Sequence, residues 1–201
     1  MSLSQSAPAD SGEPYGIVAI AASAGGITAL GHVLGGLPVG FPVPVVVVQH
    51  LDPRHKTIIA EVLGRRAKLP VVLASEGDRA VAGMIYVAPP NHHLLVEAGG
   101  VLVLSSSELV HFLRPSADLL FESVAGAYGP RALACVLTGT GSDGAMGASA
   151  IKARGGTVIV EDPELAEFKG MPEAVIAAGA ADFILPLDEI AAVIRGLVKQ
   201  E

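Results

Sequence analysis

Residues 16–26 read GIVAIAASAGG, an apolar run that ends in a serine and two glycines. A short run rich in β-branched residues and closed by turn residues is typical of a buried strand, and the glycines favour a turn into a helix over 27–34. Similar runs recur at 43–49, 71–74, 132–138 and 157–161. Strands of this kind, separated by helical segments, predict a parallel sheet that is buried on both faces.

Further helices are expected where helix signals follow these runs. Asp52 and Pro53 supply an N-cap and a first-turn proline before 57–66, and two glycines at 155–156 close a helix over 145–153. Apolar residues at helical spacing predict another, amphipathic helix over 115–125.

Two segments in the middle of the chain have a different pattern. Residues 84–90 and 93–105 read as short antiparallel strands at an edge of the sheet, and the second is a hairpin that turns at Gly99 and Gly100. The predicted fold class is therefore α/β: a doubly wound, mostly parallel sheet with helices on both faces and a small antiparallel hairpin element.

Length and composition narrow the functional classes. A chain of 201 residues is expected to form one domain, here 15–201, with residues 1–14 as a disordered lead or an expression remnant. The 51% hydrophobic content is broken into runs too short for a membrane span, so no membrane insertion is expected. A net charge of −7 without a basic cluster argues against nucleic acid as a partner. The single cysteine, Cys135, fits a reducing compartment and predicts a cytoplasmic location.

Three polar residues come just after predicted strands. In a doubly wound sheet, ligands bind beyond the carboxyl ends of the strands. Ser23, His50 and Asp143 follow three of those ends, so they are expected to face one crevice. A serine hydroxyl needs an imidazole to take its proton, and the imidazole needs a carboxylate to orient it and stabilise its charge. The three residue types therefore predict the catalytic triad of a serine hydrolase.

Each of the three also has a purely structural interpretation. Ser23 and Asp143 are favoured helix N-cap residues, and a single histidine such as His50 is more often structural than catalytic. The surroundings of Ser23 favour catalysis, because residues 21–25, AASAG, resemble the nucleophile elbow G-x-S-x-G with alanine for the first glycine. The backbone N–H groups of Ala24 and Gly25 would then lie at a helix start, where they are candidates for stabilising an oxyanion.

A competing motif predicts nucleotide binding. Residues 139–144, GTGSDG, match G-x-G-x-x-G between a strand and a helix, and Glu161 ends the next strand where a ribose-binding acid is expected. Against this interpretation, Asp143 places a negative charge at the turn that would receive pyrophosphate. A nucleotide-binding or non-catalytic signalling module on the same fold is the alternative function.

Three further residues carry weaker signals. His92 and His93 are adjacent and so point to opposite faces of a strand, which argues against a metal pair, and one of them is a candidate for lining the crevice. Arg114 precedes a predicted helix and is a candidate for holding an acidic substrate segment. Because the chain has no metal-ligand spacing, no metal is expected.

Several separated motifs together resemble the catalytic domain of CheB-type protein-glutamate methylesterases. They are ASAGG (22–26), QH (49–50), YVAPPNHH (86–93), RPSAD (114–118), LTGTGSDG (137–144) and GMP (170–172), in the family's order across about 15–198. The resemblance implies a doubly wound α/β fold and a triad that runs Ser, His, Asp along the chain. That triad falls on Ser23, His50 and Asp143.

The family's activity, as the resemblance implies it, is hydrolysis of γ-glutamyl methyl esters on chemoreceptors or related signalling proteins. Methanol is released, and deamidation of glutamine is a second reaction of the family. The hydrolase mechanism that the resemblance implies requires no cofactor. The oxyanion donors are expected in the backbone near Ala24 and Thr140. This sequence departs from better-known members, which carry Thr, Met and Asn at the positions of Ala24, Thr140 and Ser142, so the oxyanion site stays open.

The resemblance also suggests partners. The TGSDG and PPNH forms are similar to those of members that occur in larger signalling proteins, often with a methyltransferase domain, and a receiver domain typically precedes the regulated enzymes. A receiver or methyltransferase domain is therefore a candidate partner. An esterase that acts on a small molecule shares the same triad and differs only in its substrate.

Overall fold

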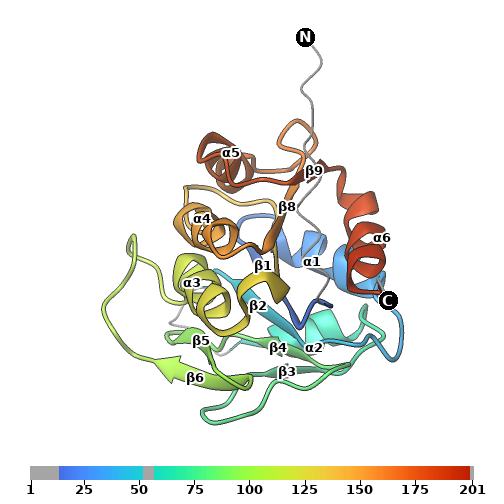
Figure 1. The fold of residues 1–201 in the computed structure, drawn as a ribbon, viewed down its shortest axis with the longest axis vertical. Coiled ribbons are helices and arrows are strands. Elements are labelled where there is room, and N and C mark those ends of the chain that lie inside the picture. Colours follow the sequence, from blue (N-terminus) through green and yellow to red (C-terminus); the bar gives the residue numbers. More distant parts are fainter. Residues whose placement is uncertain (1–13, 52–56, 200–201) are drawn as a thin grey trace.

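The computed structural model describes residues 14–51 and 57–199. Its centre is a sheet of parallel strands in the order β3-β4-β2-β1-β7-β8-β9 (Figure 1). The strands are β1 (Ile17–Ala22), β2 (Val45–Gln49), β3 (Val71–Leu73), β4 (Ile85–Val87), β7 (Ala132–Val136), β8 (Thr157–Glu161) and β9 (Phe183–Leu185). This arrangement confirms the predicted doubly wound, mostly parallel sheet.

Helices cover both faces of the sheet, as predicted. One face packs against α1 (Gly26–Gly35), α2 (Ile59–Gly64) and α6 (Leu187–Val198). The other packs against α3 (Ala117–Tyr128), α4 (Ala145–Ala153) and α5 (Gly170–Ala177), which Figure 1 shows on the left. Successive residues of β1 alternate between the two cores, which is why its sequence is apolar throughout. No helix in the described ranges is both long and apolar enough to cross a membrane.

The predicted helices are present with small shifts of their ends. The helix over 145–153 has the predicted bounds, and the amphipathic helix predicted over 115–125 begins at Ala117 and ends at Tyr128. The helix predicted over 57–66 is shorter, and its proposed cap residues, Asp52 and Pro53, lie outside the described residues. Four further elements were not predicted: α5, β9, α6 and the short 3₁₀ helix η1 (Gly129–Arg131).

The prediction of antiparallel strands at an edge is half wrong. β4 lies inside the main sheet and pairs in parallel with both β2 and β3. A buried strand of three residues carries no alternation from which its direction could be inferred. The hairpin is confirmed: β5 (His93–Glu97) pairs antiparallel with β6 (Val101–Ser105). It forms a sheet of its own, and Val96 N–H donates to Ser123 Oγ on α3 at 3.0 Å, so it covers that helix rather than a sheet edge.

The direction of winding reverses at β1. From β1 the chain passes to β2 on one side, and after β6 and α3 it returns to β7 on the other side of β1. In such sheets the loops after the two strands at the reversal separate and leave a crevice. Ser23 follows β1, His50 follows β2, and Asp143 lies in the loop after β7, so all three belong to this end of the sheet.

Candidate active site

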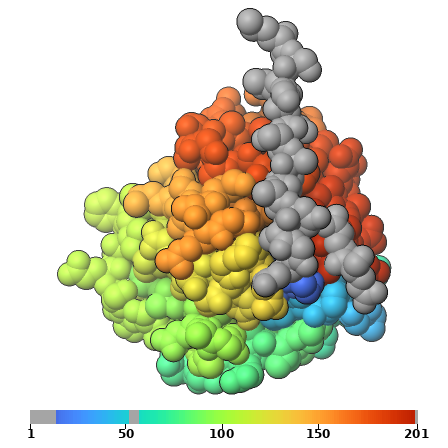
Figure 2. Space-filling model, in the orientation of Figure 1, coloured from blue at the N-terminus to red at the C-terminus, as the bar shows by residue number. Residues whose placement is uncertain are grey.

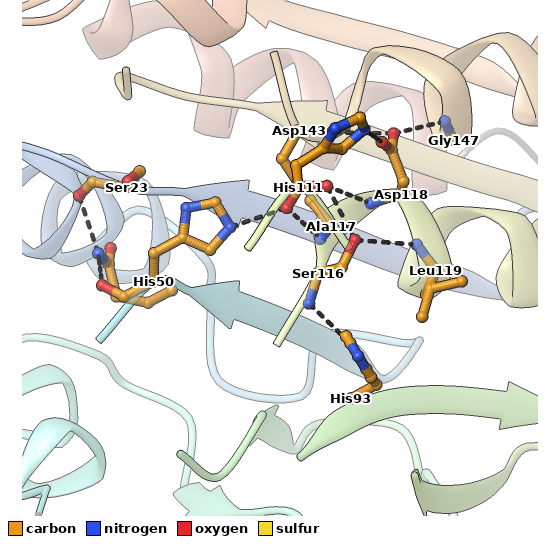
Figure 3. Close-up of polar contacts among 12 residues, drawn as sticks. Ser23, His50, His93, His111, Ser116, Ala117, Asp118, Leu119, Asp143 and Gly147 are labelled. Atoms are coloured by element: carbon orange, nitrogen blue, oxygen red, sulfur yellow. Dashed lines mark hydrogen bonds and ion pairs between the residues drawn. The ribbon is translucent and has the colours of Figure 1, made fainter. Parts of the chain in front are cut away.

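His50 and Asp143 form a largely buried hydrogen-bonded pair. His50 Nε2 lies 2.8 Å from Asp143 Oδ2, and the two side chains are 9% and 1% exposed (Figure 3). A hydrogen bond to a carboxylate is short and strong, and burial protects this one from competing water. The contact therefore fixes the orientation of the imidazole ring.

The Asp143 carboxylate sits on the amino end of α3. It accepts hydrogen bonds at Oδ1 from Ser116 Oγ (2.8 Å) and the Asp118 backbone N–H (3.0 Å), and at Oδ2 from the Ala117 N–H (2.6 Å). Burial favours a higher pKa, but the hydrogen bonds from His50 and from these backbone donors outweigh it and lower the pKa of Asp143 below its usual value. The group is therefore a carboxylate at neutral pH.

Asp118 makes the reciprocal contact. It lies in the first turn of α3, and its Oδ1 accepts from the backbone N–H groups of Gly144 (2.9 Å) and Gly147 (2.8 Å) at the start of α4. Burial raises the pKa of Asp118, and the neighbouring Asp143 charge adds to the rise. Asp143 thus caps α3, whose first turn contains Asp118, and Asp118 caps α4, which Asp143 precedes. Asp143 does not cap α4, the helix that follows it, as the structural interpretation supposed.

Ser23 stands at the end of β1 and does not cap α1. Its backbone N–H donates to Thr138 O at 3.0 Å, and its carbonyl accepts from the Gly26 N–H at 2.9 Å. The N-cap position of α1 is Gly25, in a left-handed conformation. Figure 3 shows the His50 ring between Ser23 and Asp143. Among the residues that the structure describes, none hydrogen-bonds the Ser23 hydroxyl.

The Gln49 side chain links the backbones of Ser23 and His50. Its Nε2 donates to Ser23 O at 2.8 Å and to His50 O at 3.0 Å, and the residue is 3% exposed. One amide therefore holds the main chain at both Ser23 and His50. The sequence analysis assigned Gln49 no role, although a glutamine that ends an apolar strand is a signal for a buried polar contact.

The loop after β7 packs directly against Ser23. A Cβ atom on Gly139 would lie 2.8 Å from Ser23 Cβ and 2.2 Å from Met171 Sδ, so only glycine fits there. Thr138 Oγ1 donates to Ala24 O at 3.1 Å and thereby ties this loop to the turn after β1. The backbone N–H groups of Ala24 and Thr140 make no hydrogen bond to any described residue.

A cavity of about 270 Å³ opens beside the imidazole. Its walls include His50, Asn91 and Arg114 together with the apolar side chains of Leu109, Phe112 and Leu113. Of the three predicted triad residues, His50 alone is among the described residues that line it. The cavity therefore reaches the site from the side of the histidine.

Arg114 lines this cavity, but most of its N–H groups donate to other residues of the protein. Its Nε and Nη2 donate to Asn91 Oδ1 at 3.1 and 2.7 Å, and its Nη1 donates to Ser106 O at 2.9 Å and Ser107 O at 2.7 Å. The guanidinium thus fastens the segment between β6 and α3 to the loop after β4.

The two adjacent histidines lie away from the cavity. His93 is fully buried; the Ser116 N–H donates to its Nδ1 at 3.1 Å, and its Nε2 donates to Glu108 O at 3.1 Å. Burial lowers the pKa of His93, which keeps the ring neutral. Neither His93 nor His92 is among the described residues that line the cavity. His93 instead supports Ser116, which in turn donates to Asp143.

The groups that would bind a nucleotide in the competing motif already bind other residues of the protein. Glu161 is 3% exposed, and its Oε2 accepts the Thr138 N–H at 2.7 Å, so it faces the inside of the loop rather than a ribose. The amino end of α4 already receives the Asp118 carboxylate. A pyrophosphate would have to displace that buried acid.

Known proteins resemble this chain in sequence and in fold. The family model described as CheB methylesterase matches residues 18–194. The crystal structure of the Thermotoga maritima CheB methylesterase catalytic domain superposes with a TM-score of 0.88 at 38% identity, and the match covers 92% of this chain and 100% of that one.

Curated relatives carry a double name. A putative protein-glutamate methylesterase/protein-glutamine glutaminase of Leptospira interrogans is 40% identical over 177 residues, which are 88% of this chain and 92% of that protein. A protein-glutamate methylesterase/protein-glutamine glutaminase of Paramagnetospirillum magneticum is 42% identical over 183 residues, 89% of this chain but 48% of that protein. The fold, the family model and these relatives agree, and the chain belongs to the CheB methylesterase family.

Proposed function

We propose that this chain is a protein-glutamate methylesterase in which Ser23 is the nucleophile, His50 the general base and Asp143 the carboxylate that orients the base. The observation that carries the proposal is the His50–Asp143 contact of 2.8 Å at the sheet's reversal point, next to the strand that Ser23 directly follows. The names of the relatives supply the substrate class. The substrate is a methylated chemoreceptor or a related signalling protein.

The ionised Asp143 decides which ring nitrogen acts as the base. The carboxylate can only accept, so Nε2 carries the proton that it binds, and Nδ1 keeps a free lone pair. In the acylation step, Nδ1 takes the Ser23 hydroxyl proton while the serine oxygen attacks the ester carbonyl. The His50–Ser23 hydrogen bond that this step needs forms when substrate closes the site, as such contacts often do.

Breakdown of the tetrahedral intermediate releases methanol, which takes the proton from His50. Water then attacks the acyl-enzyme with the same base and leaves a free glutamate carboxylate. The unused backbone N–H groups of Ala24 and Thr140, with Gly25 beside them, are the donors that we assign to the oxyanion. With glutamine as substrate, the same steps release ammonia in place of methanol.

Residues 15–201 form the catalytic domain in this proposal, and the site acts with residues of the protein alone. The Paramagnetospirillum relative is about twice as long as the segment it shares with this chain, which supports a receiver or methyltransferase domain as a regulatory partner. Arg114 is assigned to positioning the substrate-binding segment. The single cysteine, Cys135, supports a cytoplasmic location.

Methanol release tests the proposal. The protein and its Ser23→Ala variant are incubated with a glutamate-methylated chemoreceptor cytoplasmic fragment, and methanol is measured over time. We expect release by the parent protein and a fall of several powers of ten in the variant, the scale of a lost triad nucleophile. Equal release by the two proteins would remove Ser23 from the mechanism.

A further inference from the structure

The segment between β6 and α3 contains a tight turn with a strained backbone. Val110 and Leu113 exchange two backbone hydrogen bonds, of 3.1 and 2.8 Å, so only His111 and Phe112 lie between them. Their φ angles are 49° and 64°. Turns of this kind favour glycine, asparagine and aspartate, because a larger side chain at positive φ is strained. The chain thus keeps a histidine and a phenylalanine here at a cost in stability.

The turn presents its aromatic ring to solvent. Phe112 is 93% exposed, the highest value among the exposed large hydrophobic residues of the described chain, and Leu109 is 52% exposed. Figures 1 and 2 show this yellow-green segment reaching out from the body of the protein. A single exposed apolar residue is common, but one that is held on a strained turn contributes nothing to folding and indicates a contact with another molecule.

The segment that carries the exposed ring is fastened on both sides of the turn. Arg114 fastens the segment through Asn91 and through the carbonyls of Ser106 and Ser107. On the other side of the turn, His111 Nε2 lies 3.7 Å from Oδ2 of Asp118, in the first turn of α3 (Figure 3). A contact group that is already ordered loses little conformational entropy on binding.

The turn is continuous with the active site. Phe112 and Leu109 line the same cavity as His50, and they form part of its apolar wall. When a substrate side chain reaches His50 through this cavity, the neighbouring atoms of the substrate must therefore lie against Phe112. The cavity volume of about 270 Å³ suits one side chain, so the rest of a protein substrate would lie across the rim.

We propose that Phe112, together with Leu109, is the docking contact for the methylated protein, and that it packs against an apolar side chain beside the modified glutamate. This inference rests on the proposed function and names how that site recognises its substrate. A methyl ester is uncharged, and four of the Arg114 hydrogen bonds are spent inside the protein. Recognition at this rim is therefore apolar, and the Phe112 ring, which the bound substrate would bury, contributes most of it.

The experiment compares two substrates that share the chemistry but not the docking surface. For each variant, kcat/KM is measured on a glutamate-methylated chemoreceptor cytoplasmic fragment and on p-nitrophenyl acetate. Phe112→Gly removes the ring and also relieves the positive φ, so it is expected to fold. We expect its kcat/KM on the fragment to fall at least about tenfold further than its kcat/KM on p-nitrophenyl acetate, through KM. Phe112→Tyr, which keeps an aromatic ring, is expected to restore most of the loss.

Val39→Ser is the matched control, because Val39 is 78% exposed and precedes β2 at the amino ends of the strands. It is expected to leave the ratio of the two kcat/KM values unchanged. Equal losses on both substrates in Phe112→Gly, no loss on the fragment, or the same loss in Val39→Ser would each overturn the docking role. If the parent protein hydrolyses p-nitrophenyl acetate but not the fragment, the proposed function is wrong and this inference falls with it.

Discussion

Several side chains of this site act on the backbone of their neighbours rather than on a substrate. Gln49 donates to the carbonyls of Ser23 and His50. His93 accepts the Ser116 N–H, and the Ser116 hydroxyl in turn donates to Asp143. The positions after predicted strands were enough to single out the three proposed triad residues. The supporting contacts could not be predicted, because all but the Gln49 contact with its neighbour His50 join residues that are 23 to 27 positions apart in the chain.

Replacing Gln49 by methionine tests its role in positioning. The variant keeps the length of the side chain but leaves the Ser23 and His50 carbonyls without their donor. We expect kcat to fall about ten- to a hundredfold, because small displacements of a nucleophile and its base are costly. The pH at half-maximal kcat should not move, since no ionisable group is lost.

The control for this variant is Thr157→Val, which removes another buried hydrogen bond, 2.6 Å long and shared with Tyr15, at the amino end of β8. It is expected to lower thermal stability without lowering kcat. If Gln49→Met keeps the parent kcat while remaining folded, the bridge between Ser23 and His50 has no part in catalysis.

At the scale of elements, α3 and α4 are joined through the two acids at their amino ends. Asp143 receives the first N–H groups of α3, and Asp118 receives those of α4. Gly147 allows the helices this close, because a Cβ there would lie 2.6 Å from Phe121 Cβ and 2.7 Å from Asp118 O. The closing glycines predicted α4 to the residue, yet cap partners on another helix leave no trace in a local pattern. The same limit explains why the direction of β4 was predicted wrongly.

Gly147→Ala should therefore separate the two helices. We expect the free energy of unfolding to fall by about 1–3 kcal/mol from overpacking, and kcat to fall as the Asp118 and Asp143 contacts loosen. Gly126→Ala is the matched control within α3, since a Cβ there meets nothing within 4 Å. That change is expected to stabilise the protein by about 0.5–1 kcal/mol. Urea unfolding of the parent protein and the two variants measures both changes in the free energy of unfolding, and methanol release measures kcat. An unchanged urea midpoint in Gly147→Ala would show that the helix contact can adjust.

At the scale of the whole molecule, the sheet's reversal at β1 brings together loops that are far apart in the sequence. The rule that ligands bind beyond the carboxyl ends of such strands predicts from the sequence that a site lies among these loops. The segment between β6 and α3, which carries Phe112, was not predicted. Its place beside His50 depends on the Arg114 contacts and on the packing of the separate hairpin against α3.

Covalent labelling by a fluorophosphonate tests the central claim most directly, because the reagent reacts with a serine only when a base and an oxyanion site activate it. Mass spectrometry of the labelled protein is expected to find one adduct, on Ser23, with labelling slowed by about three powers of ten or more in His50→Ala and Asp143→Asn. Stable, folded protein that acquires no adduct, or an adduct on another residue, would contradict the assignment of Ser23, His50 and Asp143 as a catalytic triad.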